Sequence, residues 1–280
     1  MGALLTHRAN VNKTNKEPVM IKSLSAALIS LFLVCLASSQ VGYAAEAERQ
    51  LASVLTVKVK PGGQANYTEF IQKLAEAHNK LGTDVYWYAF SGTFGEPSVL
   101  TFARLFTSWG EIAPNDRQIL VEAFGPAEAT RLQALVAASG EIVDRAVYVQ
   151  RPDLSNLPPA DAPATTYSLV YSIEIKAGTG PKFEEWLSKL AQATAEIGGF
   201  RPASIWSPSF GGNNRYAVFL PLQDWSELDT PVGMTLIQRV EKVFGKREAK
   251  RLAALRDEAL VSVESNIRRF LPDLSRPVPQ

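Results

Sequence analysis

Cysteine and histidine are nearly absent from this 280-residue chain, which holds one cysteine, Cys35, and two histidines. Of these three residues only His78 lies beyond residue 45. For the rest of the chain this excludes Cys–His nucleophiles, paired-cysteine redox sites and thiolate zinc sites. A single histidine also cannot supply an HExxH motif or a two-histidine iron site. We therefore expect no metal site and no bound cofactor.

The chain also lacks a large excess of positive or negative charge. The 29 Lys and Arg side chains nearly balance the 28 Asp and Glu side chains, and the net charge is +1. Residues 1–45 hold four of the cations and one of the anions, so residues 46–280 carry 25 cations and 27 anions, a net charge of −2. This balance gives no reason to expect a nucleic-acid partner. The basic run over residues 239–251 is interrupted by Glu241 and Glu248, which is typical of a solvated helix face.

Hydrophobic runs long enough to cross a bilayer comfortably are also missing. The longest apolar stretch, residues 24–36, follows Lys22 and precedes Gly-Tyr-Ala-Ala at residues 42–45, which offers small residues for cleavage. This is the pattern of a signal peptide. We expect residues 1–45 to be removed, the protein to be periplasmic or secreted, and no membrane attachment after cleavage. An uncleaved anchor is the alternative, and the pattern leaves open whether translation begins at Met1 or Met20.

Residues 46–280 contain two copies of one sequence unit. The sequence Pro-Asp-Leu-Ser at residues 152–155 recurs at residues 272–275, an offset of 120, while earlier matches share an offset of 116. A four-residue insertion near residues 228–235 accounts for the change. The matches at offset 116 include Lys60/Lys176, Gly62/Gly178, Glu69/Glu185, Leu74/Leu190, Gly82/Gly198 and Trp109/Trp225. Ordered matches over this span predict a duplication, with repeats at 46–151 and 166–280 and a proline-rich linker at 152–165.

Each repeat carries the same order of expected elements. In the first, strands at 51–59, 85–90, 99–106 and 142–150 alternate with a helix along the apolar stripe 67–81 and with helical stretches before the last strand. In the second, the strands are expected at 168–176, 203–207, 215–220 and 261–270, with the first helix at 183–197. The order β-α-β-β-α-β is that of the ferredoxin-like α+β unit, whose helices cover one face of an antiparallel sheet. The other face of each sheet has no helices over it. We expect the two units to bury these faces against each other by forming one intrachain α+β barrel.

In its element order, its duplication and the pair Trp109/Trp225, the chain resembles the dimeric α+β barrel superfamily. It is most similar to antibiotic-biosynthesis-monooxygenase-like and NIPSNAP-like domains fused in tandem, over residues 51–274. No catalytic motif of these families is matched. The resemblance implies a barrel or cleft that holds a small apolar or aromatic molecule, and it carries over no activity.

His78 is the best single catalytic candidate, because its helical spacing puts it at the edge of the apolar face. Thr194 occupies the equivalent position in the second repeat. His78 could serve as a general base or as an axial haem ligand. The alternative, which we favour, is a hydrogen-bonded structural histidine.

An aromatic cluster is expected on the second strand. Alternation places Tyr86 and Tyr88 on the barrel-facing side and Trp87 on the other, with Trp206 as the counterpart in the second repeat. Two phenols there could bind an aromatic ligand by stacking and hydrogen bonding. Ordinary packing of aromatic strand residues is the alternative.

Charged residues on the first strands form a third candidate. Lys58 and Glu174 are equivalent positions of opposite charge, and we expect both on the face away from the helices. Arg104 adds a cation on the third strand. Buried charges of this kind need a partner, so they could bind a ligand carboxylate. A wet rim at the barrel mouth is an equal alternative.

Three functions remain open from the sequence. The first is an exported protein that binds a small apolar or aromatic molecule. The second is a cofactor-independent, monooxygenase-like enzyme in which Tyr86, Tyr88 and His78 orient a phenolic substrate and accept its proton. The third is a structural or interaction module with a filled barrel. The sequence indicates neither enzymatic activity nor an oligomeric state.

Overall fold

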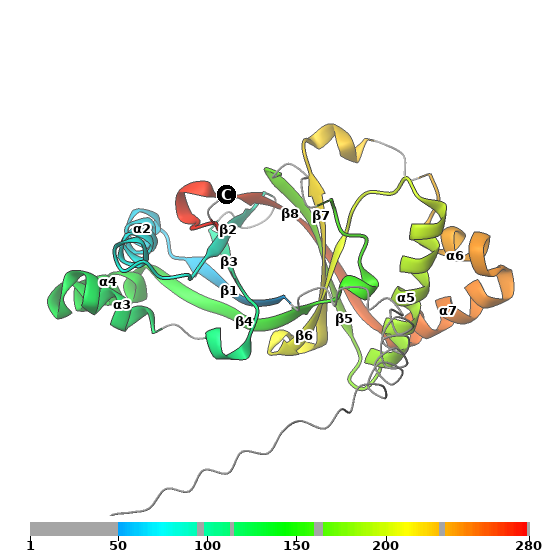
Figure 1. Cartoon of the computed structure of the whole chain (residues 1–280), viewed down its shortest axis with the longest axis horizontal. Coiled ribbons are helices and arrows are strands. Elements are labelled where there is room, and N and C mark those ends of the chain that lie inside the picture. The colour runs from blue at the N-terminus through cyan, green and yellow to red at the C-terminus, as the bar shows by residue number, and fades with distance from the viewer. Residues whose placement is uncertain (1–49, 94–97, 113–114, 160–164, 230–232, 279–280) are drawn as a thin grey trace, which may run out of the picture. The chain divides into compact units, whose positions relative to one another are not determined.

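The computed structural model describes residues 50–93, 98–112, 115–159, 165–229 and 233–278 (Figure 1). The expected signal peptide at 1–45 lies outside these residues. Ala47–Gln280 forms one compact unit. No helix in the described part of the chain combines the length and apolarity needed to span a membrane.

The two repeats have the same sequence of elements. The first contains β1 (Leu51–Val59), α2 (Gln64–Lys80), β2 (Trp87–Gly92), β3 (Val99–Phe106), α3 (Asp116–Phe124), α4 (Pro126–Ser139) and β4 (Gly140–Gln150). The second contains β5 (Tyr167–Ile175), α5 (Gly180–Ile197), β6 (Ser204–Phe210), β7 (Arg215–Leu222), α6 (Leu236–Phe244), α7 (Lys246–Ala259) and β8 (Leu260–Phe270). The predicted β-α-β-β-α-β order is confirmed, with the last helical stretch of each unit divided into two helices.

The strands close into one antiparallel barrel in the order β1-β3-β2-β8-β5-β7-β6-β4. Each half alone has the ferredoxin-like order 4-1-3-2. Two seams join the halves: β2 pairs with β8, where Phe90 lies opposite Phe270, and β4 pairs with β6, where Gln150 lies opposite Trp206. The prediction of two tandem ferredoxin-like units forming an intrachain α+β barrel is therefore confirmed.

The helices of each half lie outside the barrel (Figure 1). Hydrophobic packing is concentrated between each half-sheet and these helices. In the first half, Trp87 and Leu100 pack against Leu74 of α2. In the second, Ile205 packs with Trp186 of α5. Long apolar side chains on one face of each helix bury their surface there, at roughly 25 cal/mol per Å².

The repeated Pro-Asp-Leu-Ser segment crosses from each repeat to the other. Residues 152–154 and 272–274 form short 3₁₀ helices. Leu154, at the start of the expected linker, is buried in the core of the second repeat, and Leu274 is buried in the core of the first. Trp87 Nε1 donates a hydrogen bond to the carbonyl oxygen of Leu274 at 2.9 Å. The start of the expected linker is thus a packed element that ties the halves together, while residues 160–164 lie outside the described part.

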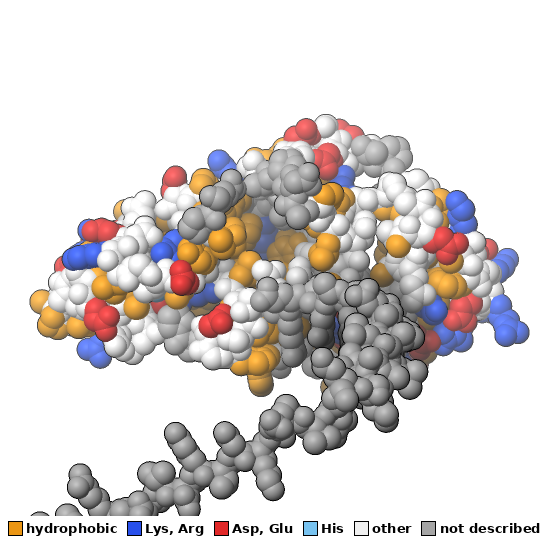
Figure 2. All heavy atoms as spheres, viewed as in Figure 1, with side chains coloured by type: hydrophobic (Ala, Val, Ile, Leu, Met, Phe, Trp, Pro, Cys, Tyr) orange, Lys and Arg blue, Asp and Glu red, His pale blue; other side chains and the backbone are white. Residues whose placement is uncertain are grey.

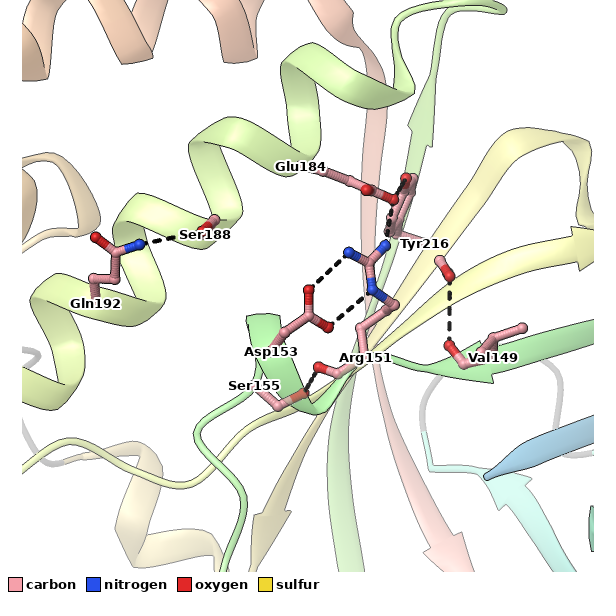
Figure 3. Close-up of polar contacts among 9 residues, drawn as sticks. Val149, Arg151, Asp153, Ser155, Glu184, Ser188, Gln192 and Tyr216 are labelled. Carbon is pink, nitrogen blue, oxygen red and sulfur yellow. Dashed lines mark hydrogen bonds and ion pairs between the residues drawn. The ribbon is translucent and has the colours of Figure 1, made fainter. Parts of the chain in front are cut away.

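A charged network fixes the first of these crossings (Figure 3). Arg151, at the end of the β4 strand, forms ion pairs with Asp153 at 2.8 Å and with Glu184 of α5 at 2.6 Å. The Tyr216 hydroxyl of β7 donates to the same Glu184 oxygen at 2.7 Å. Burial, reinforced by the Glu184 carboxylate, raises the pKa of Tyr216. The network therefore joins the end of the first repeat to the helix and sheet of the second.

The turn between β6 and β7 passes close to β4. Gly211 has φ 67°, and a Cβ atom there would lie 2.3 Å from the carbonyl oxygen of Arg145. Only glycine fits such a contact in this left-handed conformation. The approach brings Gly212 beside Tyr148, whose hydroxyl would lie 3.2 Å from a Cβ at Gly212.

Candidate functional site

The barrel interior is defined by strand alternation. Side chains such as Val57, Trp87 and Phe102 belong to the outer cores, so their neighbours along each strand point inward. The strand register extends this assignment around the barrel, since directly paired residues share a face. We call the inward-facing set the lumen; its principal members are Val54, Tyr88, Phe90, Thr101, Ala103, Tyr148, Trp206, Ala217, Phe219, Arg268 and Phe270.

Three aromatic side chains line the lumen at the β2–β8 seam. The ring centroids of Tyr88 and Phe270 are 6.3 Å apart, and those of Phe90 and Phe270 are 5.9 Å apart. All three are partly exposed and belong to neither core. Figure 2 shows this face of the molecule hollowed between the halves, with hydrophobic side chains around the hollow. Among the described residues, the seam therefore offers an aromatic wall that belongs to neither core.

Arg268 of β8 lies beside this wall. Its Nη1 donates a hydrogen bond across β2 to the hydroxyl of Thr101 on β3. Burial lowers the pKa of Arg268, and a smaller opposing effect comes from Tyr148. Among the described residues no carboxylate forms an ion pair with Arg268. A guanidinium has five N–H donors, so most of its hydrogen-bonding capacity is not used by Thr101.

Tyr148 stands at the position equivalent to Arg268, 120 residues earlier. Burial raises the pKa of Tyr148, as does Asp144, while the charges of Arg215 and Arg268 partly offset the rise. The residue equivalent to Thr101 is Ala217, which has no hydroxyl. The duplicated lumen is consequently asymmetric: one seam carries a cation and a hydroxyl, and the other a neutral phenol.

Several residues singled out from the sequence do face the lumen. Tyr88 belongs to the aromatic wall described above, and Trp206 faces the interior at the β4–β6 seam, where its Nε1 lies 3.2 Å from Ser204 Oγ. Glu174 also points inward, but it is paired with Arg215, whose Nη2 lies 3.3 Å from its carboxylate. Glu174 is therefore occupied by an internal partner.

Other expected positions are corrected by the structure. Lys58 lies between the core residues Val57 and Val59 and so faces away from the helices as expected, but it is exposed at the end of β1 instead of partly buried. Arg104 faces the helices, because its strand neighbour Ala103 points inward, and it pairs with Asp116 at 2.7 Å. Tyr86 precedes β2 and packs against the Arg276 guanidinium, 4.8 Å from its ring centroid. These three side chains do not meet in the lumen.

His78 is fully buried between α2 and the outer face of the sheet. Its ring packs edge-to-face with Trp87, with the two ring centroids 5.6 Å apart. Its Nδ1 lies 2.6 Å from Thr83 Oγ1, and its Nε2 lies 3.8 Å from Asp116 Oδ1. Trp87 points to the helices and Tyr88 to the lumen, so the sheet separates His78 from Tyr88. The arrangement of His78, Tyr86 and Tyr88 around one substrate, expected for the enzyme, is not formed.

Asp116 completes the cluster around His78. Burial raises the pKa of its carboxyl, but the nearby His78 ring and the paired Arg104 guanidinium outweigh this, and the pKa is lowered. No group of three or more His, Cys, Asp or Glu side chains suited to a metal ion occurs in the described residues. The cluster reads as a buried polar contact between α2, α3 and β3.

Sequence reasoning missed Arg268, Thr101 and Tyr148. The last strand of each repeat was placed correctly, and an offset of 120 relates Arg268 to Tyr148. Comparing inward positions between repeats would therefore have shown the exchange of tyrosine for arginine. That Thr101 lies within reach of Arg268 depends on the β2–β8 seam, which no local pattern reveals.

The fold thus defines a class, the tandem α+β barrel with an internal lumen. No family model matches the chain, and no curated protein sequence does. Among solved structures, the chain is similar to a "putative monooxygenase" from Lactobacillus acidophilus, with 8% identity, TM-score 0.47, and coverage of 82% of this chain and 97% of that one. An anthrone oxidase-like protein matches with 11% identity, TM-score 0.47 and coverage of 81% and 92%.

A chlorite dismutase from Candidatus Nitrospira defluvii in complex with imidazole also matches, with 8% identity, TM-score 0.47 and coverage of 80% and 92%. Likeness at this level transfers no activity. The assignment of the fold rests on the strand order and register of the protein itself.

Proposed function

We propose that the lumen binds a small, mainly apolar or aromatic molecule. The observation that carries this proposal is that Tyr88, Phe90, Phe219 and Phe270 point inward, belong to neither core and remain partly exposed. Apolar surface gathered in a concave interior gains about 25 cal/mol per Å² when a ligand removes it from water. A filled structural barrel would instead have its inward residues packed into a core.

Aromatic rings suit a flat ligand. The rings at the β2–β8 seam can stack on it, and Trp206 at the opposite seam can contact its other side. The phenol hydroxyls of Tyr88 and Tyr148 can hydrogen-bond its polar substituents. Because these side chains sit on strands, their positions are fixed before the ligand arrives, which lowers the entropic cost of binding.

Native mass spectrometry of the protein purified from its own host tests the proposal. We expect a retained small molecule that is released on denaturation. Replacing the inward-facing Ala103 by Trp fills the interior and should abolish retention, whereas the same replacement at the exposed Ala138 of α4 should not. Failure to find any bound molecule, together with no binding of 2-naphthalenemethanol in tryptophan-quenching titrations, would refute the proposal.

A second candidate is cofactor-independent oxygenation of a phenolic substrate. The Arg268 guanidinium favours it, because its positive charge opposes the rise in the pKa of the Tyr148 phenol and would act in the same direction on a substrate phenolate, the electron-rich form that reacts with dioxygen. His78 and Tyr86 take no part in this version, since neither faces the lumen. Oxygen uptake with anthrone, measured against the Arg268→Gln variant, separates catalysis from binding: an unchanged uptake rate in the variant removes this candidate.

Export is the remaining part of the proposal and rests on the sequence of residues 1–45 alone. We expect the mature protein to begin at Glu46. Amino-terminal sequencing of protein recovered from the host's periplasm or medium checks this. An intact N-terminus in the recovered protein would contradict it.

A further inference from the structure

Arg268 is a charged group of the lumen that has no ion-pair partner among the described residues. Removing a guanidinium from water costs several kcal/mol unless ion pairs and hydrogen bonds compensate. Arg215, the other arginine on an inward position, is compensated by Glu174. Arg268 has the Thr101 hydroxyl, and no carboxylate in the described part of the chain pairs with it.

The direction of Arg268 is set by the register of three strands. It lies opposite Gly92 on β2, and the absence of a side chain there leaves room for the long arginine side chain to pass over the strand. Its guanidinium then reaches Thr101, which is buried on β3. One hydrogen bond to this hydroxyl positions the group, and its remaining N–H donors make no hydrogen bond to the residues that the structure describes.

The aromatic wall begins directly beside this cation. Phe270 is two residues further along the same face of β8, and Phe90, its cross-seam partner, lies opposite Thr101 on β3. An apolar surface that ends at a fixed guanidinium matches a ligand with an aromatic body and an acidic group at one end. Arginine binds carboxylates with two parallel hydrogen bonds, so the match includes geometry as well as charge.

Divergence between the repeats adds an independent observation. The duplication supplied two equivalent positions, and they now hold Arg268 and Tyr148. The hydroxyl partner diverged as well, with Thr101 in one repeat and Ala217 in the other. The cation and its hydroxyl partner therefore occur together at one seam, and both are missing from the equivalent positions of the other.

We infer that the ligand of the lumen is an aromatic carboxylic acid, and that Arg268, held by Thr101, binds its carboxylate while Phe90 and Phe270 contact its ring. This inference rests on the proposed binding function and specifies its ligand class. It assigns Arg268 and Thr101 as the residues that distinguish an acid from a neutral aromatic molecule of the same size.

Two probes of equal shape test this inference on the whole protein lacking residues 1–45: 2-naphthoate and 2-naphthalenemethanol, titrated at pH 7 by calorimetry. We expect naphthoate to bind at least about tenfold more tightly, because a charge-assisted bidentate pair is added to the same ring contact. In Arg268→Gln this preference should disappear, with the affinity for the alcohol unchanged within about threefold.

Arg269→Gln is the matched control. It removes the same charge from the adjacent residue of β8, whose side chain is exposed, and should leave the preference for naphthoate intact. Thr101→Val should reduce the preference by a smaller factor, because the charge remains and only its positioning hydrogen bond is lost. Circular dichroism of each variant verifies that it is folded.

The outcomes separate the two proposals. Equal binding of both probes by the unmodified protein would overturn the acid inference and leave lumen binding in place. A preference that survives in Arg268→Gln, or that is lost in Arg269→Gln as well, would also overturn it. No binding of either probe would refute the proposed function and this inference together.

Discussion

His78 illustrates how far a single residue can be interpreted. From its spacing it is both the strongest catalytic candidate and an ordinary buried histidine. The structure encloses it completely and gives it Thr83, Trp87 and Asp116 as neighbours. The group has no route to the lumen through the sheet, so its contribution belongs to the packing of α2.

We therefore predict that His78→Ala lowers the free energy of unfolding by about 2–4 kcal/mol, since it creates a cavity beside Trp87 and removes the Thr83 hydrogen bond. Urea denaturation measures this. Thr194→Ala, at the buried equivalent position in α5, is the control and should cost less, about 1 kcal/mol. Equal effects of the two substitutions would contradict the prediction.

Asp116 gives the same cluster a dependence on pH. A carboxyl whose pKa is lowered by folding stabilises the protein above its unfolded pKa of about 4, and this stabilisation is lost as the pH falls through the folded pKa. We predict that Asp116→Asn makes the unfolding free energy less dependent on pH below about 4. Urea denaturation at a series of acidic pH values measures this.

The exposed Asp229→Asn is the control for the change in net charge. It should leave the acid dependence close to that of the unmodified protein. The interpretation of Asp116 fails if both variants flatten the pH profile to the same extent.

At the scale of elements, the repeated Pro-Asp-Leu-Ser segment has a clear physical task. Ser275 Oγ accepts a hydrogen bond from the backbone N–H of Ala89 at 2.8 Å, and Ser155 Oγ accepts one from Ile205 at 2.9 Å. Each serine thus provides a hydrogen-bond acceptor for a backbone N–H group on a strand of the other repeat. The preceding leucine fills that repeat's core, so the motif works as a crossing between the halves.

We predict that Ser155→Ala and Ser275→Ala each destabilise the protein by about 1–2 kcal/mol, because each leaves a strand N–H without its partner. The double variant should show the sum of the two effects, since the serines contact different cores. Ser265→Ala, on an exposed part of β8, is the control and should change stability by less than about 0.5 kcal/mol. Chemical denaturation measures the unfolding free energy of all four variants. If neither Ser155→Ala nor Ser275→Ala lowers it, the proposed stabilising role of the two serines is wrong.

The whole molecule is held together by both crossings and both seams. Separating the halves would break the strand pairs of β2 with β8 and of β4 with β6, and would withdraw Leu154 and Leu274 from their cores. The outer cores are separate, but neither is complete without a residue from the other repeat. The duplicated halves are therefore expected to unfold as one unit.

We predict a single urea transition, with coincident midpoints by tryptophan fluorescence and far-ultraviolet circular dichroism. Leu154→Ala should move the common midpoint to lower urea by removing about 2–4 kcal/mol, without splitting the transition. Two resolved transitions, or a loss confined to the second half in this variant, would show that the repeats are independent.

The sequence by itself determined the repeats and the elements. Periodicity and glycine-rich turns located β1 and β3 at their observed ends and the other strands to within a few residues, because local alternation reflects which face of a strand is buried. Duplication and element order were enough to predict an α+β barrel. The inward direction of Tyr88 followed from alternation alone.

Only the tertiary structure decided which inward residues meet. Arg104 was expected in the interior, yet its strand parity directs it to Asp116 and the helices. Arg268 reaches Thr101, 167 positions away in the chain, because the β2–β8 seam places β8 beside the β2–β3 pair. The physical reason is that alternation acts between neighbouring residues, whereas barrel closure depends on register between distant strands, and the candidate ligand site lies at such a junction.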